Sequence, residues 1–209
     1  MNTTLTRLEE WINSMTHYFG AILALIGTGA LLVHSLNTGN IGYIIGSMVF
    51  CFSLILLYTM SGTYHILYVG KIKKIFKILD HSAIYILISG SYTPYLLGVF
   101  DGTTKWILFF IQWGMTLLGI LFKVFFVGRF NFVSTLIYLF MGWMVMFVFK
   151  DLQLLASPLS LKLLIFGGVS YSVGTIFYLM KNKKFAHGIW HLFVLAGSVF
   201  NYFSVYFLI

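Results

Sequence analysis

Residues 41–68 read IGYIIGSMVFCFSLILLYTMSGTYHILY, a continuous stretch without aspartate, glutamate, lysine or arginine. The stretch exceeds the roughly 20 apolar residues that a helix needs to cross the hydrocarbon core of a bilayer. Near its end it carries a polar pair, Ser61 and His65, four residues apart. Ionisable residues in membrane segments are costly and usually mark a functional site. The stretch therefore predicts a membrane-spanning helix that ends at such a site.

Similar apolar segments follow one another along the whole chain. The 209 residues are 60% hydrophobic and only 9% charged, whereas a soluble domain has roughly 25% charged residues. The sequence therefore predicts an all-α polytopic membrane protein, a single seven-helix domain over residues 1–209 with a short amino-terminal segment at 1–17. The expected spans are Tyr18–Leu36, Ile41–Tyr68, Leu79–Val99, Trp106–Val127, Phe132–Phe149, Leu161–Met180 and His187–Leu208.

Short connections join the expected spans, and the basic residues divide unevenly between the two sides. The connections are expected at Asn37–Asn40, Lys71–Lys77, Phe100–Lys105, Gly128–Asn131, Lys150–Ser160 and Lys181–Lys184. Of the 13 lysines and arginines, ten fall on the side of the amino terminus and only three on the other. Basic residues concentrate on the cytoplasmic side of a membrane. We therefore expect a protein of the cytoplasmic membrane, with its amino terminus in the cytoplasm.

The net charge and the cysteine content exclude two other interpretations. A formal charge of +8 would suit a nucleic-acid-binding protein, but the sequence has no surface pattern of interleaved aromatic and basic residues. No nucleic-acid partner is expected, and the basic loops favour anionic lipid instead. The single cysteine, Cys51, lies within an apolar run, so we expect a packed thiol and no intramolecular disulfide.

Three polar clusters are expected at the cytoplasmic side of the membrane. His187 and His191 are four residues apart, so both side chains lie on one face of a helix. Together with His65 they form a set of three imidazoles, which is typical of a catalytic zinc site that keeps a position open for water. Asp80 would then hold or deprotonate the water, and Ser61 would orient the water or a substrate carbonyl. The predicted zinc site therefore lies near the cytoplasmic face.

Each cluster also has an ordinary explanation. Two histidines at this spacing are a weak motif alone, and Asp80 could form a surface ion pair with Lys77. Glu10 is expected only to favour the first turn of a helix. No role is assigned to the remaining histidines, His17, His34 and His81. The expected position of the clusters at one depth is what favours a metal site.

Several motifs extend over nearly the whole chain. They are Glu9-Glu-Trp-Ile-Asn13-Ser-Met-Thr-His17-Tyr-Phe-Gly20, Ser61-Gly-Thr-Tyr-His65, Leu79-Asp80-His81-Ser-Ala-Ile-Tyr85, Gly90-Ser-Tyr-Thr-Pro94 and His187-Gly-Ile-Trp-His191-Leu-Phe-Val-Leu-Ala-Gly197-Ser198. In these motifs the chain resembles the haemolysin III family, the bacterial branch of the progestin and adiponectin receptor superfamily.

The resemblance implies a seven-helix membrane protein with a zinc ion near the cytoplasmic side. The implied ligands are His65, His187 and His191, with Asp80 and Ser61 close to the bound water. The superfamily also looks related to alkaline ceramidases, which use a similar zinc site to hydrolyse a lipid amide. Because the long amino-terminal domain of the animal receptors is not present in this sequence, a hormone-receptor role is not expected.

These observations lead to three functional hypotheses. The first is a zinc-dependent membrane hydrolase that cleaves an amide or related acyl bond of a membrane lipid, which enters laterally between helices. The second is a non-catalytic regulator of membrane lipid composition and energetics, in which structural zinc clamps the second and seventh spans and a fatty-acyl ligand binds. The third is a cytolytic pore, although no span has the full-length polar stripe of a water-filled lumen. The sequence leaves three questions open: whether the protein is a structural membrane protein without metal, which divalent metal it would otherwise hold, and what its oligomeric state is.

Overall fold

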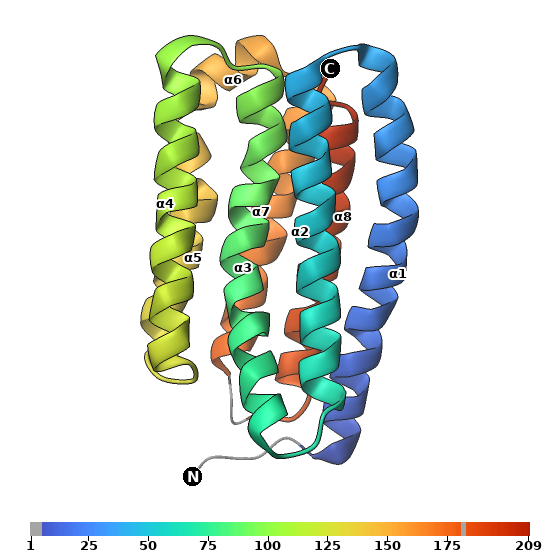
Figure 1. Ribbon diagram of the computed structural model, residues 1–209, viewed down its shortest axis with the longest axis vertical. Coiled ribbons are helices and arrows are strands. Elements are labelled where there is room, and N and C mark those ends of the chain that lie inside the picture. The colour runs from blue at the N-terminus through green and yellow to red at the C-terminus, as the bar shows by residue number, and fades with distance from the viewer. Residues whose placement is uncertain (1–5, 181–182) are drawn as a thin grey trace.

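A computed structural model describes residues 6–180 and 183–209, and within these ranges the chain is helical and contains no strand. The helices run nearly parallel or antiparallel in an elongated bundle (Figure 1). Their bounds are α1 Arg7–Thr38, α2 Ile41–Ile66, α3 Lys71–Gly98, α4 Gly102–Phe126, α5 Asn131–Trp143, the short 3₁₀ helix η1 Met144–Val148, α6 Phe149–Leu155, α7 Pro158–Leu179 and α8 Ala186–Tyr206. The expected all-α fold class is confirmed.

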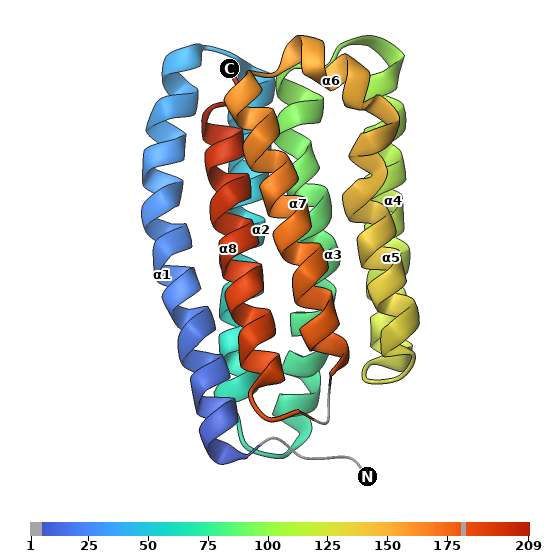
Figure 2. The same ribbon diagram turned by 180° about the vertical axis from the view of Figure 1, so that it is seen from behind.

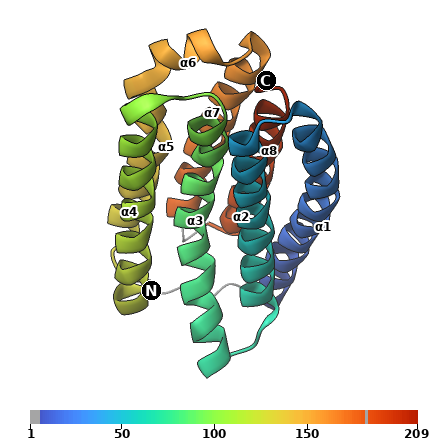
Figure 3. The ribbon, with the colours of Figure 1, turned by 45° about the horizontal axis from the view of Figure 1, so that its top comes forward.

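The helices form a compact group and an outer pair. Helix α2 packs between α1 and α3, while α8 packs against α7 and α1. Helices α4 and α5 stand beside this group and contact it mainly through α3 and α7 (Figures 1 and 2). Helix α6 lies across the end of the bundle that also holds the carboxy terminus (Figure 3). The opposite end holds the start of α1, the end of α2 and the start of α8, which is where the expected metal ligands lie.

Within residues 6–180 and 183–209, six helical stretches are long and apolar enough to cross a membrane, which makes the chain a multi-pass membrane protein. They are Arg7–Thr38, Ile41–Ile66, Gly102–Phe126, Asn131–Leu155, Pro158–Leu179 and Ala186–Tyr206. The third expected span, Leu79–Val99, falls in α3, whose 28 residues include four lysines and Asp80 and which is not among these six stretches. A crossing by α3, like the cytoplasmic amino terminus, stays a prediction.

Two of the expected connections are wrong in their local structure. Lys71–Lys77 forms the first two turns of α3, because lysine is a good helix former and the chain turns earlier, at Gly70. The expected connection Lys150–Ser160 contains most of α6 and the start of α7. The expected connection Lys181–Lys184 lies partly outside the described residues.

Two glycines allow α2 and α3 to approach each other closely. A Cβ atom placed on Gly42 would lie 1.9 Å from the carbonyl oxygen of Leu97, and one on Gly46 would lie 2.5 Å from the Cα atom of Pro94. Small residues four apart are common where membrane helices pack backbone to backbone. The close contact holds α3, and with it Asp80, against the helix that carries His65.

Gly46→Val is therefore expected to destabilise the bundle by about 1–3 kcal/mol, because the new side chain must push the α3 backbone away. Thermal unfolding of the detergent-purified protein measures the effect. Gly29→Val is the matched control, since Gly29 is exposed on α1 and a Cβ atom there meets nothing within 4 Å. Equal unfolding temperatures for the two variants would contradict this account of the α2–α3 contact.

Candidate metal centre

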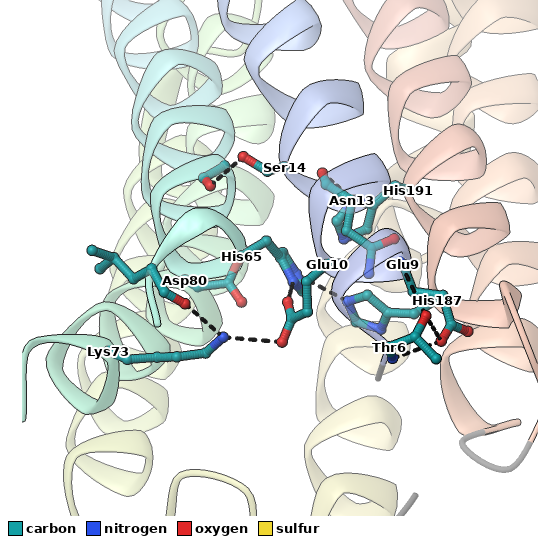
Figure 4. Close-up of polar contacts among 12 residues, drawn as sticks. Thr6, Glu9, Glu10, Asn13, Ser14, His65, Lys73, Asp80, His187 and His191 are labelled. Atoms are coloured by element: carbon teal, nitrogen blue, oxygen red, sulfur yellow. Dashed lines mark hydrogen bonds and ion pairs between the residues drawn. The ribbon is translucent and has the colours of Figure 1, made fainter. Parts of the chain in front are cut away.

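Two helices bring three histidines together at one end of the bundle (Figure 4). His65 lies in the last turn of α2, and His187 and His191 lie in the first two turns of α8. Each offers a ligand atom, and these atoms all lie within 4.8 Å of one another. The Nε2 atoms of His65 and His187 are 3.2 Å apart, close to the about 3.3 Å that two nitrogens would have around a tetrahedral ion at zinc–nitrogen distances of 2.0–2.1 Å.

A carboxylate orients the first of these imidazoles. The Nδ1 atom of His65 lies 2.6 Å from Oε2 of Glu10, so the ring donates its proton there and leaves the lone pair of Nε2 free. The other carboxylate oxygen of Glu10 accepts from Nζ of Lys73 at 3.0 Å, and Lys73 also donates to the carbonyl oxygen of Leu67. A hydrogen bond to the second ring nitrogen is the usual way in which proteins fix a metal-binding histidine. Sequence reasoning missed this role of Glu10.

The third imidazole is oriented in the same manner by α1. Nδ1 of His191 lies 3.1 Å from the carbonyl oxygen of Asn13 and 3.2 Å from Oγ1 of Thr16. With Nδ1 donating to the carbonyl, Nε2 again carries the free lone pair. Three imidazoles could thus present ring nitrogens to one point, which suits zinc and also copper, iron or nickel.

Helix α1 also fixes the start of α8. Oε2 of Glu9 accepts from the backbone N–H of Thr6 at 2.8 Å and caps its own helix. Oε1 of the same carboxylate accepts from the backbone N–H of Phe185 at 2.8 Å. Gly188 lies against Asn13, where a Cβ atom would approach Oδ1 to 3.1 Å. The first turns of α1 therefore determine where His187 and His191 lie.

Asp80 and Ser61 are buried beside the histidines. Both line the cavity that His187 and His191 also line. Oδ2 of Asp80 lies 3.2 Å from Nδ1 of His81, and the carboxylate also interacts with the Ser61 hydroxyl and His65. The alternative of a surface ion pair with Lys77 is wrong, because Asp80 is only 8% exposed and its ion-pair partner within the described residues is His81.

The histidines without an assigned role lie in different places. His81 hydrogen-bonds Asp80, and His34 stacks on Tyr206 at the far end of the bundle with ring centroids 4.1 Å apart. His17 stacks on His191 inside the site. The polar residues Glu9, Asn13 and His17 follow one another at a spacing of four on α1. That stripe on an apolar helix was the signal that could have connected α1 with the site.

The cavity beside the histidines is apolar over most of its length. Its lining comes from α1, α2, α3, α5, η1, α6, α7 and α8. From Asp80 and His187 its lining continues along Ile88 and Trp143 to Leu152 of α6, at the opposite end of the bundle. Trp143 and Ile165 line it and are also exposed on the outer surface. The cavity therefore has a polar end beside the histidines, and the rest of its lining is apolar.

Replacing Glu10 by alanine is expected to weaken metal binding by about 10–100-fold, as loss of an outer-shell partner of a ligand histidine usually does. Competition with a chelator of known affinity measures the change on the purified protein. Asp151→Ala removes an exposed carboxylate from α6, far from the histidines, and serves as the control. An unchanged metal affinity in Glu10→Ala would show that the contact with His65 has no bearing on the metal.

The fold and the site define an all-helical multi-pass membrane protein that could hold a metal on three histidines, two of them buried and one half-buried. The chain belongs to the haemolysin-III related family, whose model matches residues 5–202. It is 44% identical to the hemolysin-3 homolog of Bacillus subtilis over 199 residues, which is 95% of this chain and 93% of that protein. It is 42% identical to hemolysin-3 of Bacillus cereus over 212 residues, which is 99% of this chain and 97% of that protein.

A more distant relative is the human monocyte to macrophage differentiation factor. It is 26% identical over 211 residues, which is 96% of this chain and 84% of that protein. The expected family is confirmed, and this animal relative supports the wider superfamily.

Proposed function

We propose that this protein is a zinc-dependent membrane hydrolase that cleaves an amide or related acyl bond of a lipid. One observation carries the proposal: His187, His191, Asp80 and Ser61 line the polar end of a cavity whose remaining length is apolar, and His65 lies against His187. The elongated apolar lining suits one acyl chain, whose carbonyl carbon would lie beside the histidines. Ligand sites are commonly apolar pockets in which a few polar groups fix the orientation of the ligand.

The residues present fit zinc. His65, His187 and His191 would hold it through neutral imidazole nitrogens, with one position left toward the cavity. When bound, zinc supplies a Lewis acid that polarises a carbonyl oxygen and makes water a stronger nucleophile at neutral pH. No cysteine is among these three ligands, so the set differs from the cysteine-built sites that are typical of structural zinc.

Asp80 is the residue best placed to move the proton. Its buried carboxylate would accept a proton from the attacking water and later deliver it to the leaving amine or alcohol. His81, bonded to the carboxylate, would keep it in one orientation, and the Ser61 hydroxyl would donate to the water or to the substrate carbonyl. Because the site is shielded from bulk water, these polar interactions would be stronger than at a surface.

The substrate would enter from the bilayer. The side of the cavity between α5 and α7 is bordered by Trp143 and Ile165, which are partly exposed toward the surroundings of the bundle. Gly142 on α5 and Gly168 on α7 also line this side, and small residues leave room between helices. A lipid could thus insert its chain laterally while its amide reaches Asp80.

The test is an assay of the zinc-loaded protein in nanodiscs against a panel of N-acyl and O-acyl lipids, with released fatty acid quantified by mass spectrometry. The proposal expects fatty acid from at least one lipid class, and none after the metal is removed with chelator. The absence of product from every lipid, in protein that holds zinc, would contradict it.

A second candidate is a non-catalytic regulator of the lipid bilayer. The ligands come from α2 and α8, so a metal would clamp these helices together. Two tyrosines of α2 also contact α8: Tyr43 donates to the carbonyl oxygen of Val205, and Tyr58 donates to Oγ of Ser198. In this alternative zinc would stabilise the fold and Asp80 would be dispensable.

The third candidate is the cytolytic pore suggested by the name of the Bacillus relatives. A mostly apolar cavity gives it little support, and dye release from liposomes would test it.

A further inference from the structure

His17 is buried within the site, although neither the metal ligands nor the proposed proton transfer use it. The residue lies one turn after Asn13 on α1 and is only 3% exposed. Its ring stacks on His191 with centroids 3.5 Å apart and planes 15° apart. The ring of Tyr58 stands nearly perpendicular to it at 5.1 Å. These two neighbours fix the plane of the imidazole.

Both ring nitrogens of His17 are buried, and neither has a hydrogen-bond partner among the described residues. A neutral imidazole carries one donor and one acceptor, so two hydrogen bonds are left unmade. Buried polar groups nearly always have partners, and an exception calls for a partner that the protein itself does not supply. His17 also lines the cavity that Ser61 and Asp80 line, so the missing partner can come from a molecule bound there.

The stacked geometry argues against His17 as a fourth metal ligand. A ring nitrogen binds a metal along its lone pair, which lies in the plane of the ring. The rings of His17 and His191 lie in nearly parallel planes, so an ion in the plane of His191 lies outside that of His17. Within the described residues, the histidines whose ring nitrogens lie close enough together to share one ion are His65, His187 and His191. His17 is therefore free to contact the ligand rather than the metal.

We propose that His17 binds the polar head of the acyl ligand directly, with one ring nitrogen hydrogen-bonded to the amide of an N-acyl lipid. An amide suits either face of the imidazole, because its N–H can donate to the bare ring nitrogen and its carbonyl oxygen can accept from the protonated one. This inference rests on the proposed function, since it assumes an acyl chain in the apolar part of the cavity. It adds His17 to the groups that distinguish an amide head group from a plain hydrocarbon.

The test is equilibrium binding of tritiated palmitamide to the zinc-loaded protein in nanodiscs, with empty nanodiscs as background and zinc per chain measured in every sample. His17→Phe keeps a flat ring against His191 but has no ring nitrogen. It is expected to bind palmitamide about 5- to 30-fold more weakly, as loss of one partner of a buried polar group predicts. His17→Gln restores a donor and an acceptor and should recover part of the affinity.

Tyr58→Phe is the matched control. It removes a hydroxyl that donates to Oγ of Ser198 at 2.7 Å, next to His17 but outside the cavity lining, and should bind palmitamide as the wild type does. Hexadecane, which has no polar head, should bind the wild type and His17→Phe with equal affinity. If His17→Phe loses zinc, His17→Leu, which is smaller and also lacks a polar side-chain atom, replaces it.

The outcomes separate this inference from the proposed function. Equal palmitamide affinities for the wild type and the zinc-retaining His17→Phe or His17→Leu variant would overturn the role of His17 and leave the hydrolase standing. A wild type that binds palmitamide through His17 but hydrolyses neither N-acyl nor O-acyl lipids would refute the hydrolase and support the contact. A zinc-loaded wild type that fails to bind palmitamide would overturn the role of His17, and the lipid panel would still decide the hydrolase.

Discussion

His187→Ala is expected to abolish stoichiometric metal binding and to lower the thermal stability of the purified protein. The remaining nitrogens, on His65 and His191, cannot complete a three-imidazole set, so the loss of affinity should exceed the roughly 10–100-fold of an outer-shell change. A site occupied at 1,000 times its dissociation constant stabilises the folded state by about 4 kcal/mol, and the variant would forfeit this gain. Elemental analysis and thermal unfolding with and without added zinc measure both effects.

The control for this variant is His34→Ala. His34 is also a histidine of the bundle, but it stacks on Tyr206 at the end far from the metal centre. It should retain the metal and its zinc-dependent stabilisation. If His187→Ala kept the full metal content of the wild type, the three histidines would not be the metal site.

Asp80→Asn is expected to keep the metal but to lower turnover of the lipid substrate by about 10²–10⁴-fold, which is the usual contribution of a positioned acid–base group. Asparagine has nearly the shape of aspartate but cannot accept the proton from water. Metal content should stay at the wild-type level, because Asp80 is not one of the three ligands. Initial rates of fatty-acid release, measured beside metal content, test both statements.

The same variant separates the two main functional candidates. A structural zinc clamp predicts that Asp80→Asn behaves as the wild type in stability and in its effect on membrane lipids. Asp101→Asn, which removes an exposed carboxylate just before α4, is the control for loss of one negative charge. Turnover that survives intact in Asp80→Asn would remove the proposed role of this carboxylate.

The sequence predicted the helical fold and the convergence of the three histidines for clear physical reasons. Apolar length marks membrane helices, and a spacing of four residues places His187 beside His191 on one helix face. His65 could be assigned to the same site because short connections between successive helices place the end of α2 and the start of α8 on the same side of the bundle.

Other features could not be read from the chain. Glu10 and His65 are 55 positions apart on different helices, and their contact depends on how α1 and α2 are rotated, which hydropathy does not specify. The helical start of α3 was also missed, because a run rich in lysine is equally compatible with a loop and with a helix that extends beyond the bilayer. Interhelical contacts of side chains, rather than helix positions, are therefore what the structure adds.

The most direct test of the central claim is X-ray absorption at the zinc edge on the detergent-purified protein. The account predicts one zinc per chain, with three imidazole nitrogens at about 2.0–2.1 Å and one further light ligand. The multiple-scattering features of imidazole should diminish in protein that carries His191→Ala. A well-folded wild type without metal, or zinc surrounded by ligands other than histidine, would contradict the account.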